Sequence, residues 1–131
     1  MRKTLLIITA LLFITSAVFP QSKVNINNLV EYGGKMFKQD DDKPYTGKVF
    51  DLDKSTGTKV MEGRYKDGLK DGKWTDWFKN GQKEEERTFK DGEKDGLWIE
   101  WYSNGQKIWE KTYKDGKLIK ETGWDKYGNR K

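Results

Sequence analysis

Short apolar runs, most of them aromatic, alternate along this chain with turns in which glycine follows aspartate or asparagine. The phrase that runs from Asp71 to Lys83 recurs 24 residues later, from Asp95 to Lys107, and a looser copy begins at Thr46. A fixed period of this length is typical of stacked supersecondary units, each too small to bury its own apolar face alone. The pattern therefore predicts a repeat architecture.

Each copy has the pattern of a β-hairpin. Residues 74–78 are rich in β-forming side chains, Asn80-Gly81 is a strong turn signal, and residues 82–89 run back. Asn-Gly favours a type I′ turn, which needs positive φ at both central residues, and Asn104-Gly105 repeats it. The predicted fold class is all-β: an elongated meander or solenoid of β-hairpin repeats of about 24 residues, forming a single curled sheet.

The same reasoning divides the chain. Before the repeats, residues 29–32 and 35–38 flank Gly33-Gly34, which predicts a further hairpin. Residues 21–28 are polar and rich in asparagine, and they predict a short linker. One repeat domain is expected over 23–131, with its repeats and a capping tail at about 45–72, 73–96, 97–120 and 121–131.

Aromatic residues occupy equivalent positions in successive repeats. Trp74 and Trp77 lie three positions apart, so in a flat strand they point to opposite faces of the sheet. Either both faces carry aromatic side chains or the strand bends between them. Three columns follow from the alignment: Val49, Trp74 and Trp98; Leu52, Trp77 and Trp101; Tyr65, Phe89 and Tyr113.

The N-terminus has the pattern of a secretory signal. Arg2 and Lys3 precede an apolar run from Leu5 to Phe19, which is short for a membrane span. We expect a signal peptide over 1–22, with cleavage after Ala17 or nearer residue 22, and therefore export to the periplasm, the cell surface or the medium. The alternative is an uncleaved N-terminal anchor, which would place the protein at a membrane.

Charge and composition exclude several classes of function. The net charge is +5, and positive and negative residues alternate rather than segregate, so no basic stripe for nucleic acid is expected. The chain has no cysteine and no histidine, which removes disulfides, thiolate or imidazole catalysis and the usual zinc sites. Residues 40–42, all aspartate, read as a solvated turn, and residues 51–62 match a calcium loop only superficially. We expect no catalytic residue, no metal and no cofactor.

The repeat phrase resembles a known family. The stretches from Tyr65 to Trp74 and from Phe89 to Trp98 are similar to MORN repeats, and to the bacterial variant in which W-x-x-W-[FY]-x-N-G-Q-K precedes Y-K-D-G-x-K-D-G. The resemblance covers roughly residues 45–120 and implies a row of β-hairpins in one elongated, curled sheet. It also implies an antitoxin-like role in a toxin–antitoxin system, or binding to proteins or acidic lipids. The Y-x-G of the usual repeat is Y-K-D-G here, a departure at the position that bears on lipid binding.

These patterns together predict a non-enzymatic, exported repeat scaffold that binds a protein or an envelope component, with self-association through sheet edges as a further expectation. One alternative is a cytoplasmic antitoxin-like protein that sequesters a toxin. Another is a surface module for a carbohydrate or choline-type ligand, since aromatic cages bind quaternary ammonium groups. The residues nominated for ligand or partner contact are Trp77, Trp101 and Tyr102.

Overall fold

The computed structural model describes residues 23–131, and their regular structure is almost entirely β. The leader expected over 1–22 lies outside the described residues. Within them, no helix has the length and apolar character needed to cross a membrane. The elements are β1 (Val24–Asn25), the 3-10 helix η1 (Ile26–Asn28), β2 (Leu29–Tyr32), β3 (Lys35–Lys38), β4 (Gly47–Leu52), β5 (Lys59–Lys66), β6 (Leu69–Lys70), β7 (Gly72–Trp77), β8 (Lys83–Lys90), β9 (Glu93–Trp101), β10 (Lys107–Lys114) and β11 (Lys117–Gly123).

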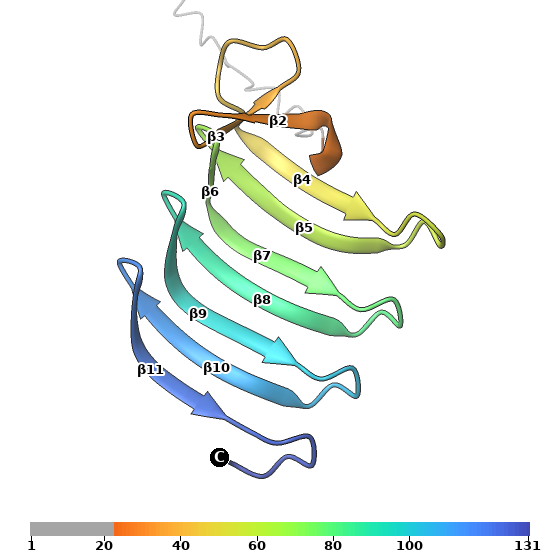
Figure 1. The fold of residues 1–131 in the computed structure, drawn as a ribbon, viewed down its shortest axis with the longest axis vertical. Helices are drawn as coiled ribbons and strands as arrows, with labels where there is room; N and C mark the ends of the chain where they lie inside the picture. The colour runs from red at the N-terminus through yellow and green to blue at the C-terminus, as the bar shows by residue number, and fades with distance from the viewer. Residues whose placement is uncertain (1–22) are drawn as a thin grey trace, which may run out of the picture.

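The described strands form one large open sheet and one small one. The large sheet has nine strands in the order β1-β4-β5-β7-β8-β9-β10-β11, with β6 paired to β5. Its strands follow one another down the long axis of the molecule, and β2 and β3 lie across one end (Figure 1). The all-β prediction is confirmed. The expectation of a single sheet is wrong, because β2 and β3 pair with each other as a separate two-stranded sheet.

The predicted linker over 21–28 is wrong from residue 24 onward. Val24 and Asn25 pair in parallel with Val49 and Phe50 of β4, so the large sheet is mixed rather than purely antiparallel. Val24 and Ile26 also pack against the hydrophobic core. Two apolar side chains among polar ones were enough to bring this segment onto the sheet, because they had buried surface to reach.

Asp-Gly, and not Asn-Gly, makes the two-residue turns. At Asp67-Gly68 both central residues have positive φ, of 49° and 80°, as a type I′ turn requires. Asp91-Gly92 and Asp115-Gly116 have nearly the same values. These turns join one hairpin to the next, and the amide of Gly92 donates to the carbonyl of Lys70 at 3.0 Å, which ties neighbouring turns together.

The type I′ turn expected at Asn80-Gly81 is a correction, because only Gly81 has positive φ there. The amide of Phe78 donates to the carbonyl of Gln82 at 2.9 Å, so the loop holds three residues and ends in a left-handed glycine. Asn80 contributes through its side chain, whose Oδ1 accepts a hydrogen bond from the Gln82 amide at 3.0 Å. The hairpin itself was predicted correctly, since the wider loop joins the expected strands.

The core lies where the small sheet covers the first strands of the large one. Its buried side chains are Leu29, Tyr45, Val49, Tyr65 and Trp74, with Val49 and Trp74 almost fully enclosed. Trp74 lies flat against Gly63 on β5: a Cβ placed on that glycine would be 2.2 Å from Cδ2 of the indole. The glycine is therefore required by the close approach of the ring.

An aromatic ladder continues from the core along one face of the large sheet, which we term the ladder face. Successive ring centroids are 5.0, 6.4, 5.4 and 5.1 Å apart, distances at which aromatic pairs attract. The two indole N–H groups are satisfied, that of Trp74 by the Arg64 carbonyl at 3.1 Å and that of Trp98 by the Thr88 carbonyl at 3.0 Å. The rings belong to Tyr65, Trp74, Phe89, Trp98 and Tyr113.

Candidate binding face

The opposite face of the large sheet carries three tryptophans, each approached by a lysine from the preceding hairpin. Lys Nζ atoms lie 5.0, 5.8 and 5.8 Å from the ring centroids, within the range of a cation–π interaction. We term this surface the tryptophan–lysine face. Its pairs are Lys59 with Trp77, Lys83 with Trp101, and Lys107 with Trp124.

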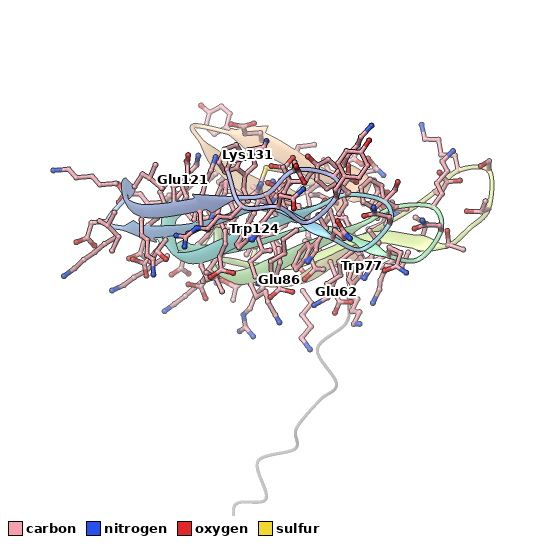
Figure 2. All side chains as sticks on the ribbon, turned by 90° about the horizontal axis from the view of Figure 1, so that it is seen from below. Glu62, Trp77, Glu86, Glu121, Trp124 and Lys131 are labelled. Atoms are coloured by element: carbon pink, nitrogen blue, oxygen red, sulfur yellow. The ribbon has the colours of Figure 1, made fainter. Side chains whose placement is uncertain are left out.

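Strand ends and bulges place these side chains. Trp77 ends β7 and Trp101 ends β9, while the lysines begin β5, β8 and β10. The register shifts between Asp76 and Trp77, so that Trp77 lies opposite Lys83. Trp77 shares its side of the sheet with Glu62 and Glu86, as Figure 2 shows. Both faces therefore carry aromatic side chains, which settles the alternative left open by the sequence.

Each of these lysines also holds a glutamate three residues further along its own strand. Lys83 contacts Glu86 at 2.6 Å and Lys107 contacts Glu110 at 2.6 Å, and Lys59 makes the equivalent bond to Glu62. The ammonium group is thus fixed between a carboxylate and an indole ring. This constraint orders a long, flexible side chain that would otherwise lose little by remaining mobile.

Two further lysines make the face positive. Lys23 lies 3.3 Å from Glu62, and Lys73 lies 3.5 Å from Glu86. The hydrogen bond from Lys59, with help from Lys23, lowers the pKa of Glu62. For Glu86, burial alone would raise the pKa, but its lysine partners outweigh that effect and lower it. Five ammonium groups therefore surround three carboxylates, and all three carboxylates are ionised at neutral pH.

The nominated residues fall partly on this face. Trp77 and Trp101 lie on it and are joined through Lys83, which pairs with Trp77 across the strands and reaches the ring of Trp101. Tyr102 is half-buried at the start of the next turn, where its amide donates to the Gln106 carbonyl at 2.8 Å. Trp124 was not nominated. Its signal was present in the sequence, because the tail from Trp124 repeats the phrase that begins at Trp101 with one residue deleted.

The ladder face bears a different charge arrangement beyond its rings. Arg87 lies opposite both Trp74 and Trp98 in the strand register and forms an ion pair with Asp76. Its Nε lies 3.5 Å from Glu85. Burial raises the pKa of Glu85, and the neighbouring acidic groups add to that effect against the attraction of Arg87.

The remaining aspartates act as turn acceptors. Oδ1 of Asp53 accepts hydrogen bonds from the amides of Ser55 and Thr56, at 3.0 Å each, and from both hydroxyl groups. The Ser55 hydroxyl, followed by the Thr56 amide, holds the pKa of Asp53 well below its usual range. Among the described residues no three carboxylates converge as a metal would require.

Chemically, the tryptophan–lysine face offers apolar ring surface, ammonium donors and carboxylate acceptors at regular intervals. Neighbouring strands are separated by about 4.8 Å, so tryptophans two strands apart recur every ~10 Å along the sheet. Such a surface suits recognition of an extended partner. Comparison of the chain with protein-family models, with curated proteins and with solved structures finds no match.

Proposed function

We propose that the protein is a non-enzymatic, exported repeat scaffold whose tryptophan–lysine face binds another protein or a component of the cell envelope. The observation that carries the proposal is the ordered row of Lys–Glu pairs against tryptophan rings. Tryptophan is enriched at binding hot spots because a single ring buries a large area. Ammonium groups that are already held in place lose little further entropy on binding.

The hairpin-repeat interpretation, and with it the resemblance to the MORN variant, is part of this proposal. It is supported by contacts that recur at the same step of 24 residues, among them the pairs of Glu62, Glu86 and Glu110 with their lysines. Turns recur in the same way, with Gly81 and Gly105 at φ of 85° and 86°. Stacked units of one kind would present their side chains as a linear array, which suits a partner that lies along the sheet.

A choline-type ligand fits this face less well than an extended partner does. In an aromatic cage the ligand's ammonium group occupies the ring face. Here Lys59, Lys83 and Lys107 already approach the rings. A small cation would have to displace a lysine and break its bond to glutamate.

The first test is the intact mass of the protein in each fraction of its native cells. A species outside the cytoplasm that has lost about the first 17 to 22 residues supports the exported scaffold. Full-length protein in the cytoplasm would contradict export and favour the antitoxin-like alternative. Full-length protein in the membrane fraction would indicate an anchored scaffold.

The second test locates the binding face. A photo-crosslinking amino acid at Lys73, whose side chain is 62% exposed on the tryptophan–lysine face, is expected to give one discrete adduct in native cells. The same substitution at Lys126, an exposed residue of the C-terminal turn, serves as the control and is expected to give none. The adduct should disappear in a Trp77→Ala, Trp101→Ala background. Equal adducts from both positions, or an adduct that survives these substitutions, would contradict the proposal.

A further inference from the structure

The small sheet leaves an apolar surface on its outer side. Residues alternate between its two sides, so Leu29 and Met36 face the core while Val30 and Phe37, which pair across the strands, face outward. Tyr32 shares the outward side, with its ring edge-to-face against Phe37 at a centroid distance of 6.4 Å. The Val30, Tyr32 and Phe37 surface is the outer hairpin face.

This surface is more exposed than the folding of the chain requires. Tyr32 is 79% exposed and Val30 is 48% exposed, although both lie in a regular strand of a well-packed hairpin. Isolated exposed apolar residues are ordinary, but a contiguous set on one sheet face is a common mark of an interaction site. The set lies at one end of the molecule, on the small sheet and away from the row of tryptophans.

The following loop turns the exposed surface into a hollow. The chain from Lys38 folds back so that Pro44 bridges to Phe37, and Asp40 adopts a left-handed conformation with φ of 63°. The hollow has a volume of about 340 Å³. Its lining combines the outer hairpin face with Lys38 and the three consecutive aspartates Asp40, Asp41 and Asp42.

The charge of the rim defines the chemistry of an occupant. Three carboxylates stand against one ammonium group, and that group, Nζ of Lys38, lies 5.6 Å from the ring of Tyr45. The rim is therefore negative beside an apolar floor. Complementary potential at such a rim favours a cationic partner and disfavours an acidic one.

We propose that the outer hairpin face is a docking site for a basic, apolar segment of a partner protein. An apolar side chain of that segment fills the hollow against Tyr32 and Phe37, and an adjacent lysine or arginine meets Asp40, Asp41 and Asp42. This site is separate from the tryptophan–lysine face and stands or falls independently of it.

The test uses the full chain and a library of random short peptides displayed on phage. Selection is expected to enrich peptides in which lysine or arginine neighbours a large apolar residue. The affinity of the best enriched peptide is then measured by fluorescence anisotropy. Tyr32→Ser should weaken it by about tenfold or more, as removal of a central aromatic contact does.

Two further variants separate apolar contact from charge. Asp40→Asn, Asp41→Asn and Asp42→Asn together should weaken binding and flatten its salt dependence, because the rim then carries no negative charge. Tyr127→Ser is the matched control, since Tyr127 is 73% exposed and lies in the C-terminal turn. It should leave the affinity unchanged.

Several results would overturn the site. They are the absence of enrichment, enrichment of peptides without basic residues, and equal affinity for the wild type and Tyr32→Ser. If Tyr32→Ser does not fold, the triple asparagine variant decides in its place. Trp77→Ala should leave peptide binding intact, so failure here is distinguishable from failure of the proposed function.

Discussion

Glycine at two positions is required for different physical reasons, and the difference is measurable. At Gly63 the obstacle is space, because an added Cβ would lie 2.2 Å from the indole of Trp74. Trp74 is 1% exposed, so its ring has nowhere to move. At Gly81 the added Cβ would meet no atom within 4 Å, and only the φ of 85° opposes a side chain.

We expect Gly63→Ala to reduce the free energy of unfolding by about 2–3 kcal/mol, the usual cost of overpacking a closed core. Gly123→Ala is the matched control. Its Cβ would lie 2.4 Å from the ring of Trp109, which is only half-buried near the edge of the sheet and can shift. Chemical denaturation of both variants should show the larger loss for Gly63→Ala. Equal losses would mean that Trp74 also relaxes.

The adjacent residues Glu85 and Glu86 should respond to pH with opposite signs. A carboxyl group whose folded pKa is raised contributes stability at low pH that is lost as the pH rises through that pKa. At pH 7 the ionised Glu85 therefore lowers stability, because burial raises its pKa. For Glu86, whose pKa is lowered, the contribution is present at pH 7 and is lost as the pH falls through the folded value.

Glu85→Gln should accordingly stabilise the protein at pH 7 and Glu86→Gln should destabilise it, each by less than about 1 kcal/mol because both side chains are partly solvated. Both differences should shrink as the pH is lowered to ~3, where ordinary carboxyl groups are protonated. Thermal unfolding of the two variants at pH 3 and pH 7 provides the measurement. A stabilising effect of Glu86→Gln at pH 7 would contradict the assigned ion pairs.

At the scale of the element, each hairpin depends on a loop with one left-handed glycine at one end and an Asp-Gly turn at the other. Gly81→Ala should cost about 1 kcal/mol, because alanine disfavours positive φ. Gly81→Asn should cost less, since asparagine tolerates the left-handed region. Equilibrium denaturation distinguishes the two. Equal costs would show that the loop changes its type when the glycine is lost.

The hairpins were predictable from sequence and their turn types were not. The order of apolar runs and glycines located β7 and β8, and the strands lie where the pattern placed them. The type of turn depends on strand register as well as composition, and the shift between Asp76 and Trp77 gives the Asn80-Gly81 loop its third residue. A short sequence window contains no information about that register.

At the scale of the whole molecule, burial is uneven along the sheet. The buried hydrophobic side chains all lie between residues 29 and 74, where the small sheet covers the ladder face. Beyond Phe89 the aromatic rings remain half-buried. Opening of the sheet should therefore begin at the β10–β11 end, where the fewest apolar contacts are lost.

Hydrogen exchange followed by mass spectrometry should reveal this gradient. Amides of β4, β5 and β7 are expected to exchange slowest and those of β11 fastest. The Tyr65→Ala variant, which removes the first ring of the ladder, should accelerate exchange in β5 and β7 more than in β10. Uniform protection from β4 to β11 would instead indicate one fully cooperative unit.

The outer edge of β11 bears on the predicted self-association. Within the described chain β11 pairs only with β10, and it exposes Leu118 and Ile119. A bulge beside Ile119 and the residues Lys117 and Lys120 are features that oppose pairing between edges. Lys117→Thr with Lys120→Thr should therefore increase the mass measured by light scattering at high concentration. An unchanged mass would mean that the bulge alone protects the edge.

The sequence by itself determined the β class, the positions of most strands and the residues of the aromatic columns, because these depend on local patterns with periods of two and 24 residues. The tertiary structure alone decided that residues 24–28 join the sheet, that β2 and β3 fold over one end, and which face receives each tryptophan. It also brought Trp124 into one row with Trp77 and Trp101. These features depend on register and on contacts between residues far apart in the chain, which a local pattern does not specify.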